Sequence, residues 1–179
     1  MVLRTLALAA VFSLFLASAS AQTHQPYAGL QARPIKALSD DQVADLKAGR
    51  GMGLAMAAEL NGYPGPMHVL ELADKLHLGT GQKETVEKLF AAMKGDAVPL
   101  GQKLIDAEAS LDKSFADRTI TQAELDRATQ AIATLQGELR VAHLKYHLLV
   151  SSLLTPEQRN RYAELRGYTG KPAAHPHKH

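Results

Sequence analysis

Two histidines four residues apart, His143 and His147, have the spacing in this chain that is best suited to chemistry. Side chains at positions i and i+4 of a helix share one face, and two imidazoles in that arrangement can chelate a transition-metal ion. His68 and Glu71, three residues apart, would add an imidazole and a carboxylate from another helix. The competing interpretation of His68 and Glu71 is a solvated or hydrogen-bonded helix face. Nitrogen and oxygen ligands of this kind suit zinc, nickel, cobalt or copper(II).

Two further groups of residues could bind metal. His175, His177 and His179 occupy every second position near the end of the chain, a composition that either binds metal loosely while unfolded or is incidental. Six consecutive histidines are missing there, which argues against a purification tag. The four internal methionines are Met52, Met56, Met67 and Met93. They are interpreted as packing residues, with copper(I) ligation as the lesser alternative.

Several classes of protein are excluded by what the sequence lacks. His68 and Glu71 would need a histidine where Leu72 stands to resemble an inverted zinc-protease motif, and neither H-E-x-x-H nor G-x-S-x-G occurs. Absence of cysteine excludes disulfides and thiolate metal sites. The 20 basic and 18 acidic residues form no basic block of the kind that binds nucleic acid. We therefore predict a non-enzyme with no organic cofactor and no nucleic-acid partner.

The first 21 residues have the pattern of an export signal. Arg4 forms a short basic region, residues 6–16 are apolar, and residues 19–21 (Ala-Ser-Ala) form a cleavage site. An uncleaved membrane anchor would need about 20 apolar residues, more than this run provides. The sequence therefore predicts an exported protein that is cleaved after Ala21.

Apolar residues recur at steps of three and four along two long segments, before and after residues 118–120. This spacing is typical of long coiled-coil-like helices. Pro99 lies inside the first segment, where we expect a kink without a break because the apolar pattern stays in register. Since the connection is short, residues 82–118 and 121–150 are expected to form an antiparallel hairpin. The predicted fold class is all-α.

The short connection also predicts which residues of the two helices face each other. Across an antiparallel hairpin with its loop at residues 118–120, the numbers of facing residues sum to about 239. Gln158 then lies opposite Gly81, at the open end of the hairpin. The same sum places Asp96 level with His143, where its carboxylate would complete the metal ligand set.

Two short elements, each with leucine and glutamine four positions apart, lie at that open end. Their shared residues are Leu78, Thr80 and Gln82 in the first copy, and Leu154, Thr155 and Gln158 in the second. In the second copy Thr155 can cap a helix, Pro156 suits the first helical position, and Gln158 can close a capping box. In the first copy Gly79 stands where the second has threonine, so we expect a looser cap.

Paired Leu-x-x-x-Gln elements in a small exported helical protein resemble the Spy/CpxP-like superfamily of periplasmic chaperones and heavy-metal sensors. The resemblance covers roughly residues 66–167 as a pattern of helices, although its specific residues are few. It implies a bent helical hairpin in which the two elements pack together, and a periplasmic location. It also implies a membrane-bound signalling partner, because sensors of this kind often act through one.

Shorter helices are predicted to flank the hairpin, over residues 40–60, 66–77 and 156–166. Glycines at 49, 51 and 53 are interpreted as close helix packing or fraying rather than a phosphate loop, because no strand precedes them. The flanking helices or a second protomer must cover the apolar face of the hairpin, so we expect a homodimer.

The ends of the chain are predicted to be disordered, at residues 22–38 and 169–179. The helical domain would then comprise residues 39–168. Two functions fit these observations. The first is the binding of divalent heavy metals, for sensing, buffering or resistance. The alternative is an ATP-independent chaperone or adaptor that holds unfolded periplasmic proteins on an amphipathic surface. The histidine pair favours metal binding.

Overall fold

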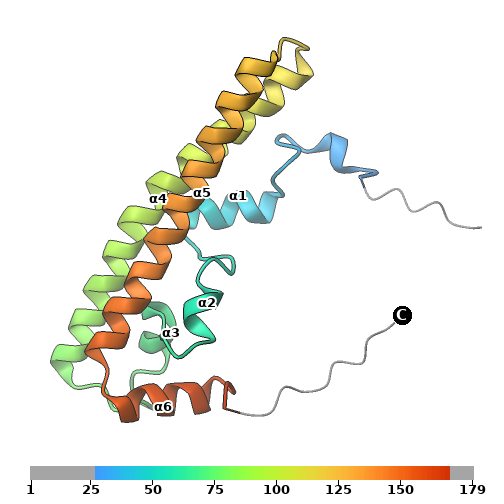
Figure 1. The fold of residues 1–179 in the computed structure, drawn as a ribbon. Helices are drawn as coiled ribbons and strands as arrows, with labels where there is room; N and C mark the ends of the chain where they lie inside the picture. Colours follow the sequence, from blue (N-terminus) through green and yellow to red (C-terminus); the bar gives the residue numbers. More distant parts are fainter. Residues whose placement is uncertain (1–26, 170–179) are drawn as a thin grey trace, which may run out of the picture. The chain divides into compact units, whose positions relative to one another are not determined.

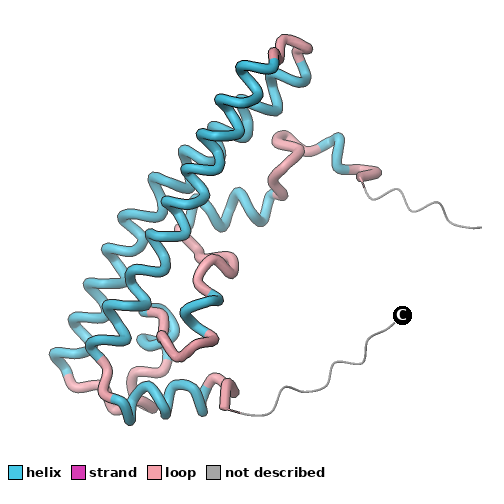
Figure 2. The backbone as a smooth tube through the Cα atoms, viewed as in Figure 1, coloured by secondary structure: helices cyan, strands magenta, loops and turns pink. Residues whose placement is uncertain are grey.

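The computed structural model describes residues 27–169 (Figure 1). The predicted export signal and the histidines of the C-terminal tail lie outside the described residues. Helix makes up 71% of the described residues and no strand occurs among them, which confirms the all-α fold (Figure 2). Within residues 27–169, no helix combines the length and apolarity that a membrane crossing requires.

The described residues divide into two compact units, residues 27–31 and 32–169. In the first unit, Leu30 N donates a hydrogen bond to Tyr27 O at 3.0 Å, and Gly29 N donates to the side chain of Gln31 at 2.8 Å. A short 3-10 helix, Leu30–Ala32, begins there. The second unit contains the α-helices of the described residues, α1 to α6.

Two long helices form an antiparallel hairpin, as the apolar spacing predicted (Figure 1). Helix α4 spans Thr80–Ala116 and continues through Pro99 without a break. Helix α5 spans Gln122–Leu153 and begins with a capping box, in which Thr121 accepts from the backbone of Glu124. The turn between the helices includes Arg118, whose φ of 56° lies in the left-handed region.

Four shorter helices complete the second unit. Helices α1 (Asp40–Ala48) and α3 (Pro66–Glu71) pack on α4, while α2 (Met56–Glu59) packs on α5. Helix α6 (Pro156–Leu165) follows α5 after two residues with an extended backbone, Leu154 and Thr155. One face of the hairpin is thereby covered from within the chain, and the homodimer stays a prediction.

The predicted continuous helix over residues 40–60 is wrong. Helix α1 ends at Gly49, which adopts the left-handed conformation with φ 64° and caps the helix. Met52 and Gly53 also have positive φ, of 44° and 82°. Because a right-handed helix cannot pass through such residues, a loop separates α1 from the single turn of α2. The expected helix over 66–77 is also shorter, since α3 ends at Glu71 and turns follow.

Disorder over residues 22–38 was also predicted, and the structure corrects this for residues 32–38. Ile35 and Leu38 pack against the core of the hairpin. Lys36 bonds Asp112 of α4 through both its backbone N, at 3.3 Å, and its Nζ, at 3.1 Å. Two apolar side chains and an ion pair thus tie the segment to the hairpin. Residues 22–26 lie outside the described part.

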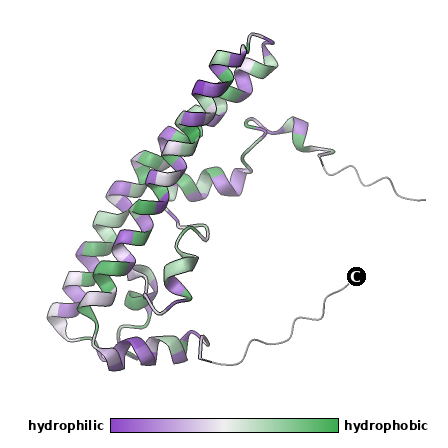
Figure 3. Cartoon of the chain, viewed as in Figure 1, coloured by the Kyte–Doolittle hydropathy of each residue, from purple (hydrophilic) through white to green (hydrophobic). Residues whose placement is uncertain are grey.

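Two clusters of buried apolar residues lie along the hairpin, whose two long helices carry hydrophobic and hydrophilic residues interspersed along their length (Figure 3). The loop-side cluster is formed by Leu46, Ala97, Leu104, Ile105, Ile132 and Leu139. The open-end cluster is formed by Val69, Leu76, Val86, Val150, Leu154 and Tyr162. Burying one large aliphatic side chain stabilises a fold by about 1.5–3 kcal/mol, so these clusters hold α1, α3 and α6 to the hairpin.

At the open end, Gln82 and Gln158 form a reciprocal pair of amides, here named the glutamine clasp. Each Nε2 donates to the other Oε1 at 3.0 Å. Gln82 Nε2 also donates to Leu153 O at 3.1 Å, and Gln158 Nε2 to Leu76 O at 3.4 Å. The predicted meeting of the two Leu-x-x-x-Gln elements is therefore confirmed, one residue from the expected register.

The two copies differ in their helix caps, which gives a testable difference in stability. Thr155 Oγ1 accepts from Gln158 N at 3.2 Å, whereas Gly79 offers α4 no side-chain cap. Replacing Thr155 by alanine should therefore lower the free energy of unfolding by about 1 kcal/mol. The matched change, Gly79→Ser, should raise it by a few tenths, because a Cβ there meets nothing nearer than Gln82 Oε1 at 3.9 Å. Urea denaturation measures both. Equal stability of the Thr155→Ala variant and the native chain would contradict the capping role.

Candidate metal site

His143 and His147 lie on α5 between the two core clusters, with Leu139 on one side and Val150 on the other. Their exposed fractions are 2% and 7%, so both imidazoles are buried. Their spacing predicted a shared helix face but not its burial. That face is buried because the segment that carries α2 and α3 covers it.

The ring of His147 is held in one orientation by its neighbours. Its Nδ1 lies 2.7 Å from Tyr63 O, so Nδ1 carries the proton and donates it to that carbonyl. Nε2 of the neutral ring is then an acceptor, which is the state that a metal ligand needs. Gly65 lies directly against the ring, since a Cβ at that position would be 2.7 Å from Cε1 of His147. A larger residue at Gly65 would displace the imidazole.

His143 has a buried ring nitrogen that lacks a hydrogen-bond partner. Its Nε2 is fully buried and makes no hydrogen bond with any residue between 27 and 169. Burial lowers the pKa of His143 below its usual value, and the nearby His147 lowers it further. The imidazole is therefore neutral at neutral pH. A buried neutral nitrogen without a partner is costly unless something binds it.

Both imidazoles line a cavity of about 690 Å³ between α5 and the segment that carries α2 and α3. His68 lines the same cavity, and its Nδ1 is 2.9 Å from Glu71 Oε2. The Glu71 side chain is 57% exposed and does not line the cavity. His68 and the pair thus share one cavity without converging as a ligand group, and Glu71 is the hydrogen-bond partner of His68 at the surface.

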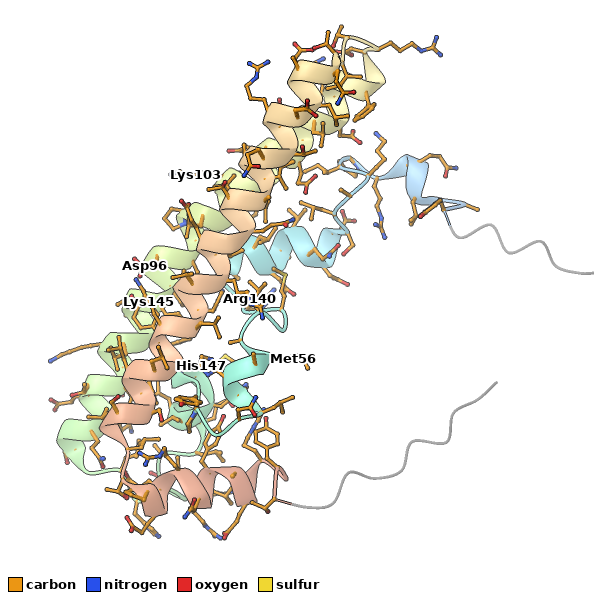
Figure 4. All side chains as sticks on the ribbon, in the orientation of Figure 1. Met56, Asp96, Lys103, Arg140, Lys145 and His147 are labelled. Atoms are coloured by element: carbon orange, nitrogen blue, oxygen red, sulfur yellow. The ribbon has the colours of Figure 1, made fainter. Side chains whose placement is uncertain are left out.

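Asp96 lies elsewhere. The hydroxyl of Tyr146 and the Nζ of Lys145 each lie 2.6 Å from Asp96 Oδ2, and they lower the pKa of this carboxyl, Lys145 more strongly. Asp96 and Lys145 line a separate groove on the hairpin, whereas His147 faces the cavity near Met56 (Figure 4). The sum of facing residue numbers predicts how far along the hairpin two residues lie, but not on which side of each helix their side chains lie. For this reason it placed Asp96 beside His143.

Within the described part of the chain, no group of three or more histidine, aspartate or glutamate residues converges as a metal site. The imidazole pair therefore needs donors of another type. Thioether sulfur is one such source, which the sequence suggested only as the lesser alternative. All four methionines that were interpreted as packing residues line the cavity of the imidazole pair. Because these methionines come from a loop and three helices, their spacing in the sequence does not indicate that they line one cavity.

Glu59 of α2 is a residue that the sequence did not single out. Its side chain is 12% exposed and accepts hydrogen bonds from the hydroxyls of Tyr162 and Tyr168 and from Gly65 N at 3.2 Å. Burial, and then the bond to Glu59, raise the pKa of Tyr162 well above its usual range. Glu59 thereby ties α6 to the Gly65 turn, which in turn seats His147.

Comparison with known families gives one match. A family model described as "LTXXQ motif family protein" matches residues 65–166, more than half of the chain. Leu154, Thr155 and Gln158 follow that pattern, whereas the first copy has Gly79 at the threonine position. The matched region holds the glutamine clasp and the imidazole pair. Comparisons with curated proteins and with solved structures found no match.

Proposed function

Because this chain belongs to the LTXXQ motif family, whose members are generally periplasmic, we propose that it is a periplasmic protein that binds a transition-metal ion through His143 and His147. The observation that carries the proposal is the state of the two rings. Both are buried at i and i+4, one is oriented through Tyr63 O, and the other has a buried nitrogen without a partner among the described residues. The ion would be zinc, nickel, cobalt or copper, bound for sensing, buffering or resistance.

Binding at these rings would couple to the stability of the fold. The imidazoles belong to α5, while another wall of the same cavity belongs to the segment that carries α2 and α3. An ion bound to the imidazoles and to a donor on that wall would hold the two elements together. At one hundred times its dissociation constant, such an ion raises the free energy of unfolding by about 2.7 kcal/mol.

Calorimetric titration of the chain from residue 22 tests the proposal. With residues 170–179 deleted, we expect one site to remain, and His143→Gln with His147→Gln to abolish it. Binding should weaken in acid, because protons compete for the ring nitrogens, and burial places this competition at His143 below the usual histidine range by lowering its pKa. His77→Asn is the matched control, since His77 has a φ of 51° that asparagine tolerates. Two results together would show that the folded site does not exist. The chain without residues 170–179 would bind no metal, and the chain that keeps those residues but carries both glutamine substitutions would bind metal normally.

A chaperone is the second candidate, and exposed apolar side chains on α5 favour it. Val141, Leu148 and Leu149 are 60%, 56% and 48% exposed. Such a surface could hold unfolded segments or a second protomer. The two candidates separate in one assay: a chaperone suppresses aggregation of an unfolded substrate with metal chelated and without ATP, and charged substitutions at Leu148 and Leu149 would remove that suppression.

A further inference from the structure

The four internal methionines have an arrangement that packing does not explain. The chain has five methionines, including Met1, and the other four line the imidazole cavity. Met52, Met56 and Met67 are 41%, 58% and 41% exposed, whereas Met93 is 7% exposed. A methionine that only filled the core would be buried. The interpretation as a packing residue therefore holds for Met93, whereas the other three are too exposed to be core residues.

A strained loop brings sulfur and nitrogen donors close together. Met52 has a φ of 44°, which is uncommon for a residue other than glycine and often marks a functional site. A Cβ on Gly51 would lie 3.6 Å from Nδ1 of His143, and one on Gly53 would lie 3.3 Å from Sδ of Met56. The two glycines thus let the loop lie directly against an imidazole on one side and a thioether on the other.

The carboxylates around the cavity are already bonded to the protein. Asp45 Oδ1 lies 2.5 Å from Nε of Arg50, and Glu59 accepts from the hydroxyl of Tyr162. The donors left for an ion are imidazole nitrogen and thioether sulfur. Thioether ligands select soft copper(I), whereas zinc prefers nitrogen, oxygen or thiolate, and magnesium and calcium require oxygen.

We infer that the cavity is a copper(I) site, in which the thioethers of Met52, Met56 and Met67 complete the ligand set begun by His143 and His147. This inference rests on the proposed function, because it uses the same two imidazoles, and it specifies the ion and its oxidation state. The position of the His143 ring supports it independently of methionine exposure, since its Nδ1 lies against Gly51 in the loop that carries Met52.

Anaerobic competition with the copper(I) chelator bicinchoninate tests the site. The protein is the chain from residue 22 with the three tail histidines changed to alanine. We expect one copper(I) ion per chain. Met52→Leu, Met56→Leu and Met67→Leu together should weaken its binding by roughly tenfold or more, the range seen when even an outer-shell partner of a metal ligand is lost. Leucine keeps the volume and removes the sulfur. Affinity for zinc or nickel, bound through the imidazoles, should change less than twofold.

Leu148→Met is the matched control, because it adds an exposed thioether on α5 outside the cavity and should leave copper(I) affinity unchanged. X-ray absorption of the copper-loaded protein should show a sulfur shell, and this measurement stands even if the triple variant misfolds. Copper(I) affinity that is unchanged in a folded triple variant, or a copper spectrum with no sulfur, overturns the inference while leaving imidazole binding of divalent ions intact. Failure to bind either copper(I) or divalent ions overturns the proposed function as well.

Discussion

Gly101→Ala should destabilise the protein by about 1–3 kcal/mol, because the added methyl group overpacks the contact between α1 and α4. A Cβ at Gly101 would lie 2.5 Å from the carbonyl oxygen of Leu46 and 3.0 Å from its carbonyl carbon. These are backbone atoms, so rotation of a side chain cannot relieve the clash. Leu46 is 2% exposed and belongs to the loop-side cluster, so α1 can move away only by opening that cluster.

Gly95→Ala is the matched control for this prediction. Gly95 lies in the same helix, and a Cβ there meets nothing within 4 Å. Alanine is favoured over glycine inside a helix by about 0.8–1 kcal/mol, so this variant should be more stable than the native chain. Urea midpoints at unchanged m-value measure both effects. If the two variants shift the midpoint in the same direction, the close contact between α1 and α4 is not present in solution.

Tyr162→Ala should cost about 3–5 kcal/mol, the range for removing a large buried aromatic side chain. Tyr162 is 1% exposed in the open-end cluster, and its hydroxyl donates to Glu59. Tyr162→Phe should account for about 1–3 kcal/mol of this loss, because it deprives a buried carboxylate of one donor. Thermal or urea unfolding separates the two contributions.

Tyr63→Phe serves as the control for the hydroxyl effect, since Tyr63 is 42% exposed and the change should stay within about 0.5 kcal/mol. Backbone contact between Tyr63 and His147 is kept in this variant. A Tyr162→Phe protein as stable as the native chain would show that Glu59 does not depend on that hydroxyl. The link from α6 through Glu59 to the Gly65 turn would then be wrong.

The hairpin and the clasp could be predicted because they depend on local rules. Apolar residues at steps of three and four define one face of a helix, and a short connection makes two helices antiparallel. The position of the loop then predicts which residues of the two helices face each other. Gln82 and Gln158 therefore met within one residue of the expected register. His143 and His147 were found for the same reason, since their spacing within one helix is visible in the sequence.

The rest of the candidate site depends on tertiary packing that spacing does not encode. Asp96 was expected at the right height, but its direction around α4 takes it to Lys145 and Tyr146. The loop that carries Met52 forms because of the glycines at 49, 51 and 53. From the sequence, these glycines were interpreted as sites of close packing or fraying in a longer helix. The folding of this loop back against His143 is what gathers the methionines, and this depends on backbone conformations with positive φ.

The glutamine clasp also determines which part of the hairpin forms last and opens first. Its two amides are 76 positions apart in the chain. Contacts near the turn of a hairpin form with the smallest loss of entropy, because the entropy cost of closing a loop grows with the number of residues enclosed. The clasp is therefore made at the end of folding, and its hydrogen bonds are among the first to break in partial unfolding. Its opening would release the start of α6, so we expect amide exchange with solvent to begin at this end of the molecule.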